Sequence, residues 1–266
     1  MRGVFRTNVP RSIDVAIVLA LLVGFGAWGA KYWKSVTARG QPFYYQLYFE
    51  PAVMVACGKG FVVSRPQVPE MASFLQQKVD LFSCGAIPPD APLGTDDLFQ
   101  LGSWRYLMLT VGWTWRLFGV SWRALGPLFG ALFGATIAAA YTIFRLGMGP
   151  VLSVVGAVAL RFSLLHLKYL PVLRDYAKAP FALALIALLG LLVVRRATWK
   201  SVPTIAVLYG AVAGIGYGFR TDFIADIPPF LLALVLFLDG GILRNLRLKA
   251  AGGILCLAAF KLLAAK

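Results

Sequence analysis

A long apolar run, from Ile13 to Trp33, directly follows an N-terminal segment that carries Arg2, Arg6 and Arg11. A secretory signal has a shorter apolar core, of roughly 7–15 residues, whereas a membrane-spanning helix needs about 20. The run therefore predicts an uncleaved first transmembrane helix. Its arginine-rich end should lie in the cytoplasm, because positive residues collect on that side of a membrane.

The composition of the whole chain agrees with a membrane location. Hydrophobic residues make up 59% and charged residues 14% of the sequence, against roughly 45–50% and about 25% in soluble domains. The net charge of +15 could suggest a nucleic-acid partner. The basic residues, however, stand in short clusters between apolar runs, a pattern typical of membrane topology and lipid contact. The chain is therefore expected to be an integral membrane protein that binds no nucleic acid.

The apolar runs predict an all-α polytopic membrane protein of about seven transmembrane helices. The segment 1–33 holds the N-terminus and the first helix, and 34–123, which has no spanning run, is predicted as a long outer loop. The segment 124–266 should hold the remaining helices. Their expected ranges are 125–144, 151–167, 181–194, 202–219, 227–238 and 250–263.

Three stretches of the outer loop are predicted to be helices that lie on the membrane surface, at 41–61, 70–79 and 103–118. The third carries Trp and Arg through its length, which favours an interfacial position over a crossing. If 103–118 crossed the membrane, the basic clusters around Arg195 and Arg244 would lie outside, against the positive-inside rule.

Two of the three cysteines, Cys57 and Cys84, fall in this same loop. They could form a disulfide if the loop faces an oxidising compartment. The alternative, two unpaired small apolar residues, is the interpretation that we favour from the sequence.

A run of Leu-Phe-Gly-Val-Ser-Trp-Arg-Ala-Leu at 117–125 leads into a helix of small residues that ends at Tyr141 to Arg145. Together with the cytoplasmic N-terminus, single helix and long outer loop, this pattern resembles the membrane glycosyltransferases of the GT-C superfamily. The most similar by pattern are the protein O-mannosyltransferases and the lipid A aminoarabinose transferases, which share a seven-helix module. The resemblance covers most of the chain, through architecture and loose motifs.

The resemblance implies two acidic site residues. Members hold a catalytic Asp or Glu in the first outer loop, upstream of a turn that Gly-Lys-Gly-Phe at 58–61 matches. The usual acidic pair would fall near 42–45, where this chain has none, so Glu50 is the carboxylate available. A second acid, after the third helix, matches Asp175 in Leu-Arg-Asp-Tyr-Ala-Lys-Ala-Pro at 173–180.

The activity implied by the resemblance is transfer of a sugar from a polyprenyl-phosphate donor, at the outer face of the membrane, to an acceptor that the sequence does not identify. Glu50 stands among aromatic residues, where desolvation would raise its pKa and favour a general base. The leaving phosphate needs cationic donors, and a divalent metal ion could bridge the acids and the phosphate. The candidate cationic residues are Arg161, His166, Lys168, Arg174, Lys178 and Arg220.

Each candidate also has a structural interpretation. Glu50 could be a solvated loop acid, Asp175 a salt-bridge partner or helix cap, and His166 an interfacial residue. Arg161 lies inside an apolar segment, where a charge usually faces a cavity or a partner. The glycines 214, 216 and 218 are expected to permit close helix packing. Arg220 and Asp222, which follow them, could form a structural pair at that contact.

Two other functions remain open from the sequence. One is a lipid-linked carrier, flippase or transporter, although no inverted repeat with broken helices is visible. The other is a non-catalytic membrane subunit, which the missing acidic pair favours. In all three cases the expected location is a bacterial inner membrane, with the active face periplasmic or extracellular.

Overall fold

The computed structural model describes residues 11–37, 44–95, 104–194, 198–238 and 244–264. Arg2, Arg6, Arg195 and the start of the 41–61 stretch lie outside the described residues. The described chain is mostly helical. In chain order, the elements are α1 (Arg11–Thr37), η1 (Tyr44–Phe49), α2 (Glu50–Ala56), β1 (Val63–Ser64), α3 (Pro69–Leu75), η2 (Cys84–Ala86), β2 (Leu93–Gly94), α5 (Arg105–Phe118), η4 (Arg123–Leu125), α6 (Gly126–Phe144), α7 (Pro150–Ala159), η5 (Leu160–Phe162), α8 (Leu164–Tyr169), α9 (Leu173–Tyr176), α10 (Ala179–Val194), α11 (Ser201–Phe219), η6 (Thr221–Asp226), α12 (Ile227–Phe237) and α13 (Leu246–Leu263).

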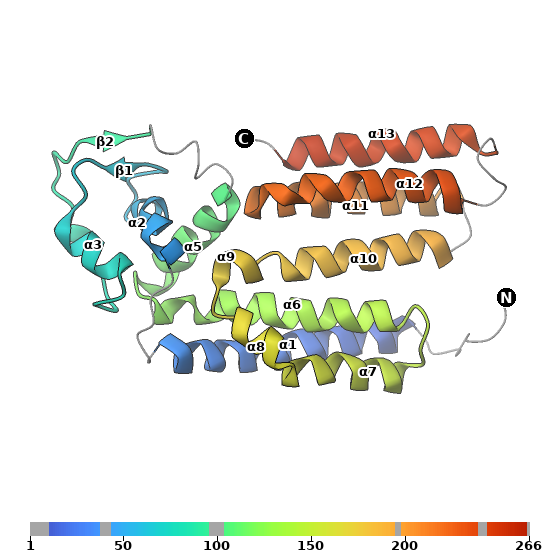
Figure 1. The fold of residues 1–266 in the computed structure, drawn as a ribbon, viewed down its shortest axis with the longest axis horizontal. Helices are drawn as coiled ribbons and strands as arrows, with labels where there is room; N and C mark the ends of the chain where they lie inside the picture. The colour runs from blue at the N-terminus through green and yellow to red at the C-terminus, as the bar shows by residue number, and fades with distance from the viewer. Residues whose placement is uncertain (1–10, 38–43, 96–103, 195–197, 239–243, 265–266) are drawn as a thin grey trace.

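The long helices run side by side, and the short elements α2, α3, β1 and β2 gather at one end of them (Figure 1). The side-by-side set comprises α1, α6, α7, α10, α11, α12 and α13. We call residues 44–95 and 104–122, which form α2, α3, α5 and the antiparallel β1–β2 pair, the cap. Successive long helices reverse direction, so their ends lie alternately near the cap and far from it (Figure 1).

Within the described residues, four helices are long and apolar enough to cross a membrane. Their outer faces expose large apolar side chains, for example Val23 on α1 and Ile186 on α10, as expected of a lipid-facing surface. The prediction of a helical membrane protein is supported to this extent. The four segments are Ser12–Thr37, Arg123–Phe144, Leu173–Val194 and Ser201–Phe219.

Glycines allow α1 and α6 to pack with their backbones in close contact. A Cβ atom on Gly130 would collide with the carbonyl oxygen of Gly26, and one on Gly134 with the carbonyl oxygen of Leu22. Small residues at four-residue spacing are the usual means by which membrane helices approach each other closely. This pair of helices therefore depends on the absence of side chains at these positions.

The glycine series of α11 has the same role, and the prediction that it permits close packing is confirmed. A Cβ atom on Gly214 would lie 2.7 Å from the carbonyl oxygen of Phe260 on α13, and one on Gly216 would lie 2.9 Å from the ring of Phe223.

An ion pair joins α1 and α6 at the end remote from the cap. Arg145 donates to both carboxylate oxygens of Asp14, at 2.7 and 3.0 Å, and the Tyr141 hydroxyl donates to the same carboxylate at 2.5 Å. Such a two-point contact between guanidinium and carboxylate fixes the relative rotation of the two helices.

The cap has an aromatic core of its own. The rings of Phe74 and Trp122 stack at 5.2 Å, and Trp115 meets Trp122 edge-on at 5.3 Å. The indole nitrogen of Trp122 donates to the carbonyl oxygen of Phe74, and that of Trp33, at the end of α1, donates to the carbonyl oxygen of Trp122. These buried indoles attach the cap to the first long helix.

The prediction that the first stretch of the loop lies on a membrane surface is wrong for its helix α2. Residues 50–55 of α2 are all buried within the protein, because α2 packs on α5. Cys57, at the end of α2, forms a disulfide with Cys84, so the favoured interpretation of two unpaired cysteines is also wrong. The segment that was expected to be an outer loop is a folded cap, and this disulfide cross-links it.

The third apolar segment is shorter than expected. Helix α7 passes into the η5 turn, which ends at Phe162, and the helical path breaks at Ser163, whose hydroxyl caps α8. The predicted range, 151–167, therefore contains two helices. The last helix, α13, is longer than predicted, since it begins at Leu246.

Candidate functional site

An ion-pair network lies where α9, α11 and η6 meet at the cap end of the helices. Asp175 pairs with Arg220, and its Oδ1 is 3.5 Å from Nε of Arg174. Arg220 also contacts Asp222 at 3.3 Å, and Lys178 lies 3.5 Å from the same carboxylate. Arg174 and Arg220 thus contact the predicted acid directly, whereas Lys178 joins the network through Asp222. The expected pair of Arg220 with Asp222 is confirmed.

The local fold explains why these side chains converge. In the short helix α9, Leu173 and Tyr176 are buried, which leaves Arg174 and Asp175 on the side that remains partly open. The helix α11 ends at Phe219, and the extended backbone of Arg220 then turns its side chain toward α9. The side chains of Asp175 and Arg220 keep 30% and 24% of their exposure, so a ligand could reach them.

The network also contacts the cap through Arg174. Its guanidinium lies 5.2 Å from the ring of Trp104, a cation–π contact, and Trp104 meets Tyr48 edge-on. The sequence reasoning missed Trp104, because two segments so far apart in the chain share no local pattern.

His166 belongs to a separate, more buried group. Its Nε2 lies 2.9 Å from the hydroxyl of Tyr176, and its ring lies 5.1 Å from that of Phe133. Burial lowers the pKa of His166, because a low-dielectric environment disfavours the charged imidazolium. The neutral ring can exchange a hydrogen bond with Tyr176, but it adds no positive charge to a phosphate site at neutral pH.

The two remaining cationic residues lie apart from the network. The guanidinium of Arg161 lies 4.8 Å from the ring of Trp28 on α1, which in turn contacts Phe133. Lys168 is exposed on α8. The expectation that Arg161 faces a partner is confirmed, and that partner is an aromatic ring.

Glu50 occupies a structural position in the cap. One carboxylate oxygen accepts hydrogen bonds from the backbone nitrogen and the hydroxyl of Ser64, at 2.7 and 2.6 Å, and the other accepts from Gln67 at 2.7 Å. The residue is only 6% exposed. The solvated-loop alternative inferred from the sequence is therefore wrong, because the carboxylate is buried and bound by polar groups of the cap.

Glu50 and Asp175 also have different partners, so the contacts found give no shared two-acid site. Glu50 joins α2 to β1, whereas Asp175 joins α9 to the end of α11. In the described part of the chain, no group of three or more His, Cys, Asp or Glu side chains comes together that could hold a metal ion. A bridging metal stays a prediction without structural support.

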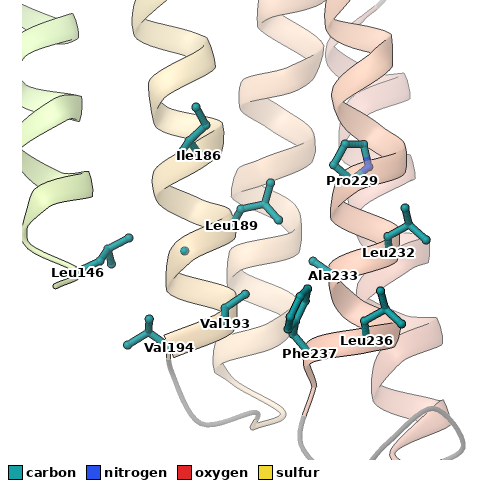
Figure 2. Close-up of a pocket in the computed structure, with 11 residues that line it drawn as sticks. Leu146, Ile186, Leu189, Val193, Val194, Pro229, Leu232, Ala233, Leu236 and Phe237 are labelled. Atoms are coloured by element: carbon teal, nitrogen blue, oxygen red, sulfur yellow. The ribbon is translucent and has the colours of Figure 1, made fainter. Parts of the chain in front are cut away.

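An apolar groove lies along α10 and α12 (Figure 2). It includes the last residues of α10, at the end of that helix remote from the cap (Figure 1). It has a volume of about 610 Å³. The sequence led us to expect an apolar groove near the cationic residues, whereas none of those residues lines this one. Its lining is Leu146, Ile186, Leu189, Gly190, Val193, Val194, Pro229, Leu232, Ala233, Leu236 and Phe237.

These features define a helical protein of membrane type that has a disulfide-bonded cap and an ion-pair network beneath it. Comparisons with protein-family models, with curated proteins and with solved structures found no match. The resemblance to GT-C enzymes therefore stays an expectation from the sequence, and function has to be argued from the network itself.

Proposed function

We propose that the chain crosses the membrane with seven helices and holds its cap outside. Support comes from the alternating directions of the long helices (Figure 1) and from the Cys57–Cys84 disulfide, since disulfides persist in oxidising compartments. The short helices α7 and α12 would require tilt or local thinning of the bilayer. The ion-pair network would then stand at the outer surface of a bacterial inner membrane.

We further propose that the protein is a glycosyltransferase that uses a polyprenyl-phosphate sugar as donor. The observation that carries this proposal is Asp175, a partly exposed carboxylate held between Arg174 and Arg220. Lys178 belongs to the same network through Asp222. A carboxylate among cations combines a group that can accept a proton with groups that can bind a phosphate.

In the proposed reaction an acceptor hydroxyl oxygen attacks the anomeric carbon of the sugar. The bond between that carbon and the phosphate oxygen breaks, and its electron pair leaves with the polyprenyl phosphate. Asp175 takes the proton of the hydroxyl. A guanidinium has five N–H donors, so Arg220 can hold Asp175 and still donate to the leaving phosphate. Glu50 stabilises the cap in this scheme and takes no proton.

The test compares Asp175→Asn with the wild type. Purified protein in lipid nanodiscs is incubated with a panel of radiolabelled polyprenyl-phosphate hexoses and pentoses, together with extracted envelope acceptors, and release of polyprenyl phosphate is measured. Loss of a general base should lower the rate by about 100-fold or more. Asp90→Asn, an exposed cap variant, is the matched control and should keep the full rate. Unchanged activity in Asp175→Asn would refute the assignment.

A second candidate function is a non-catalytic membrane subunit. The observation that favours it is that the Glu50 carboxylate is bound by Ser64 and Gln67 of the cap. Asp175 is then left as one proposed catalytic acid, whereas the resemblance implies two acidic site residues. In that case the protein should co-purify from mild detergent with a stoichiometric partner, and no donor of the panel should turn over.

A further inference from the structure

Helix α5 exposes an apolar stripe that the protein leaves uncovered. Its other face packs on α2, where Gly112 allows contact with the backbone of Ala52. On the open side, Trp113 is 52% and Leu117 is 74% exposed. Large apolar side chains that are exposed together on one helix usually belong to a surface that contacts a protein or a membrane.

The direction of this stripe follows from Tyr106, in the first turn of α5. The hydroxyl of Tyr106 donates to the carbonyl oxygen of Leu263 at 2.8 Å, and its ring fills the space beside Gly218. Both partners lie at the cap ends of long helices, α13 and α11. Tyr106 therefore points from α5 toward the bundle of long helices.

Trp113 and Leu117 point the same way as Tyr106. They follow it by seven and eleven residues, and with 3.6 residues per turn these positions return to within about 20° of its direction. Tyr106 meets the ends of two long helices, whereas Trp113 and Leu117 remain exposed. If the bundle crosses a bilayer, the space beside these two side chains would lie at the level of the helix ends, where lipid would meet water.

Both ends of α5 are tied to the ends of long helices, which keeps the helix at that level. Its first turn is attached to α13 and α11 by Tyr106, and its last residue, Phe118, is joined through the η4 turn to the start of α6 at Gly126. These attachments hold α5 close to the cap ends of the long helices.

The chemistry of the stripe fits the boundary between lipid headgroups and acyl chains. The guanidinium of Arg116 lies 5.1 Å from the ring of Trp113, so a cation stands directly beside the aromatic and aliphatic side chains. Trp settles at the headgroup level, and Arg extends its charge toward lipid phosphate. Helices that lie in the plane of a membrane combine these residue types.

We propose that the exposed stripe of α5 is a membrane-contact surface, in which Trp113 and Leu117 enter the lipid boundary and Arg116 binds lipid phosphate. This contact would fix the height and tilt of the cap above the ion-pair network. It depends on the chain crossing a bilayer and not on which reaction, if any, the network performs.

Spin labels test the contact in the full chain reconstituted in phosphatidylcholine and phosphatidylglycerol nanodiscs. In a Cys256→Ala background, which removes the buried free thiol and keeps the disulfide, nitroxides are attached at Trp113→Cys and Leu117→Cys. Accessibility to oxygen, which concentrates in lipid, is compared with accessibility to a water-soluble nickel chelate. The matched control is Glu70→Cys, exposed on α3, which lies at the far side of the cap (Figure 1).

Labels at 113 and 117 should favour oxygen severalfold more than the label at 70. Equal access of the nickel chelate at all three positions would overturn the proposal, because the stripe would then face water. Low access of both reagents at 113 and 117 would overturn it as well, since that result indicates a protein partner. Exposed positions are chosen so that the substitutions leave the cap folded, which the intact Cys57–Cys84 disulfide reports on non-reducing gels.

Discussion

At the scale of single residues, Glu50 illustrates how a carboxylate can be held for structural reasons. It is nearly fully buried and accepts hydrogen bonds from Ser64 and Gln67. Removal of a buried acceptor leaves its donors without partners, and each lost hydrogen bond to a charged group costs about 1.5–3 kcal/mol.

Glu50→Ala is expected to destabilise the cap by about 3 kcal/mol or more. The measurement is the thermal unfolding midpoint in one detergent, together with the rate of proteolysis within the cap. Glu70→Ala, on the exposed first turn of α3, should change neither value by much. A Glu50→Ala protein that is as stable as the wild type, yet inactive, would instead return Glu50 to the reaction.

His166 should make stability depend on pH. Burial lowers its pKa from 6.5, so the folded state binds a proton less readily than the unfolded state. The His166 contribution is complete above pH 6.5 and is lost as the pH falls through the lower, folded pKa. Unfolding free energy should therefore decrease in mild acid. In His166→Gln that part of the decrease should vanish, and identical pH profiles for both proteins would contradict the assignment.

At the scale of elements, the contact between α1 and α6 is set by glycine. Gly130→Ala would place a methyl group against the backbone at Gly26, and the enforced separation should cost about 1–3 kcal/mol. The control is Gly24→Ala, on α1, where a Cβ atom would meet nothing within 4 Å. That variant should be neutral or slightly more stable, because Ala favours helix over Gly. Equal unfolding midpoints for both variants would argue against this packing.

At the scale of the whole molecule, the Cys57–Cys84 disulfide can be used to test both the stability of the cap and the side of the membrane on which the cap lies. Cys57 and Cys84 are 27 residues apart, and closing a loop of that length should stabilise the cap by about 3–4 kcal/mol. The Cys57→Ser/Cys84→Ser double variant should lower the unfolding midpoint accordingly. Asp90→Asn, an exposed variant in the cap that touches no disulfide, provides the comparison.

The same pair of cysteines tests the proposed orientation. In intact cells, a membrane-impermeant reductant followed by an impermeant maleimide should label Cys57 and Cys84, because the cap is proposed to lie outside. Without the reductant no labelling of these two residues is expected. Labelling that requires cell lysis would place the cap on the cytoplasmic side and refute the proposed topology.

The sequence by itself determined the helical, membrane-type character of the chain and the positions of its longest helices. Apolar run length and charge clustering are local properties, so 125–144 and 202–219 were located to within a residue or two in α6 and α11. The sequence around Asp175 also suggested a salt-bridge partner, and in the structure Asp175 contacts Arg174 and Arg220. The first helix, expected at 13–33, is extended in the structure to Arg11–Thr37.

Only the tertiary structure decided what the loop between α1 and α6 does. Ser64 and Gln67 reach Glu50, Cys84 reaches Cys57, and Trp104 reaches Arg174, because the chain folds back on itself over long sequence separations. Hydropathy records how apolar a residue is, and it holds no information on which distant partner satisfies it. For the same reason, the sequence suggested a catalytic role for Glu50, whose partners in the structure are Ser64 and Gln67 of the cap. Asp175 is the proposed acid whose side chain stays partly exposed, in contact with Arg220.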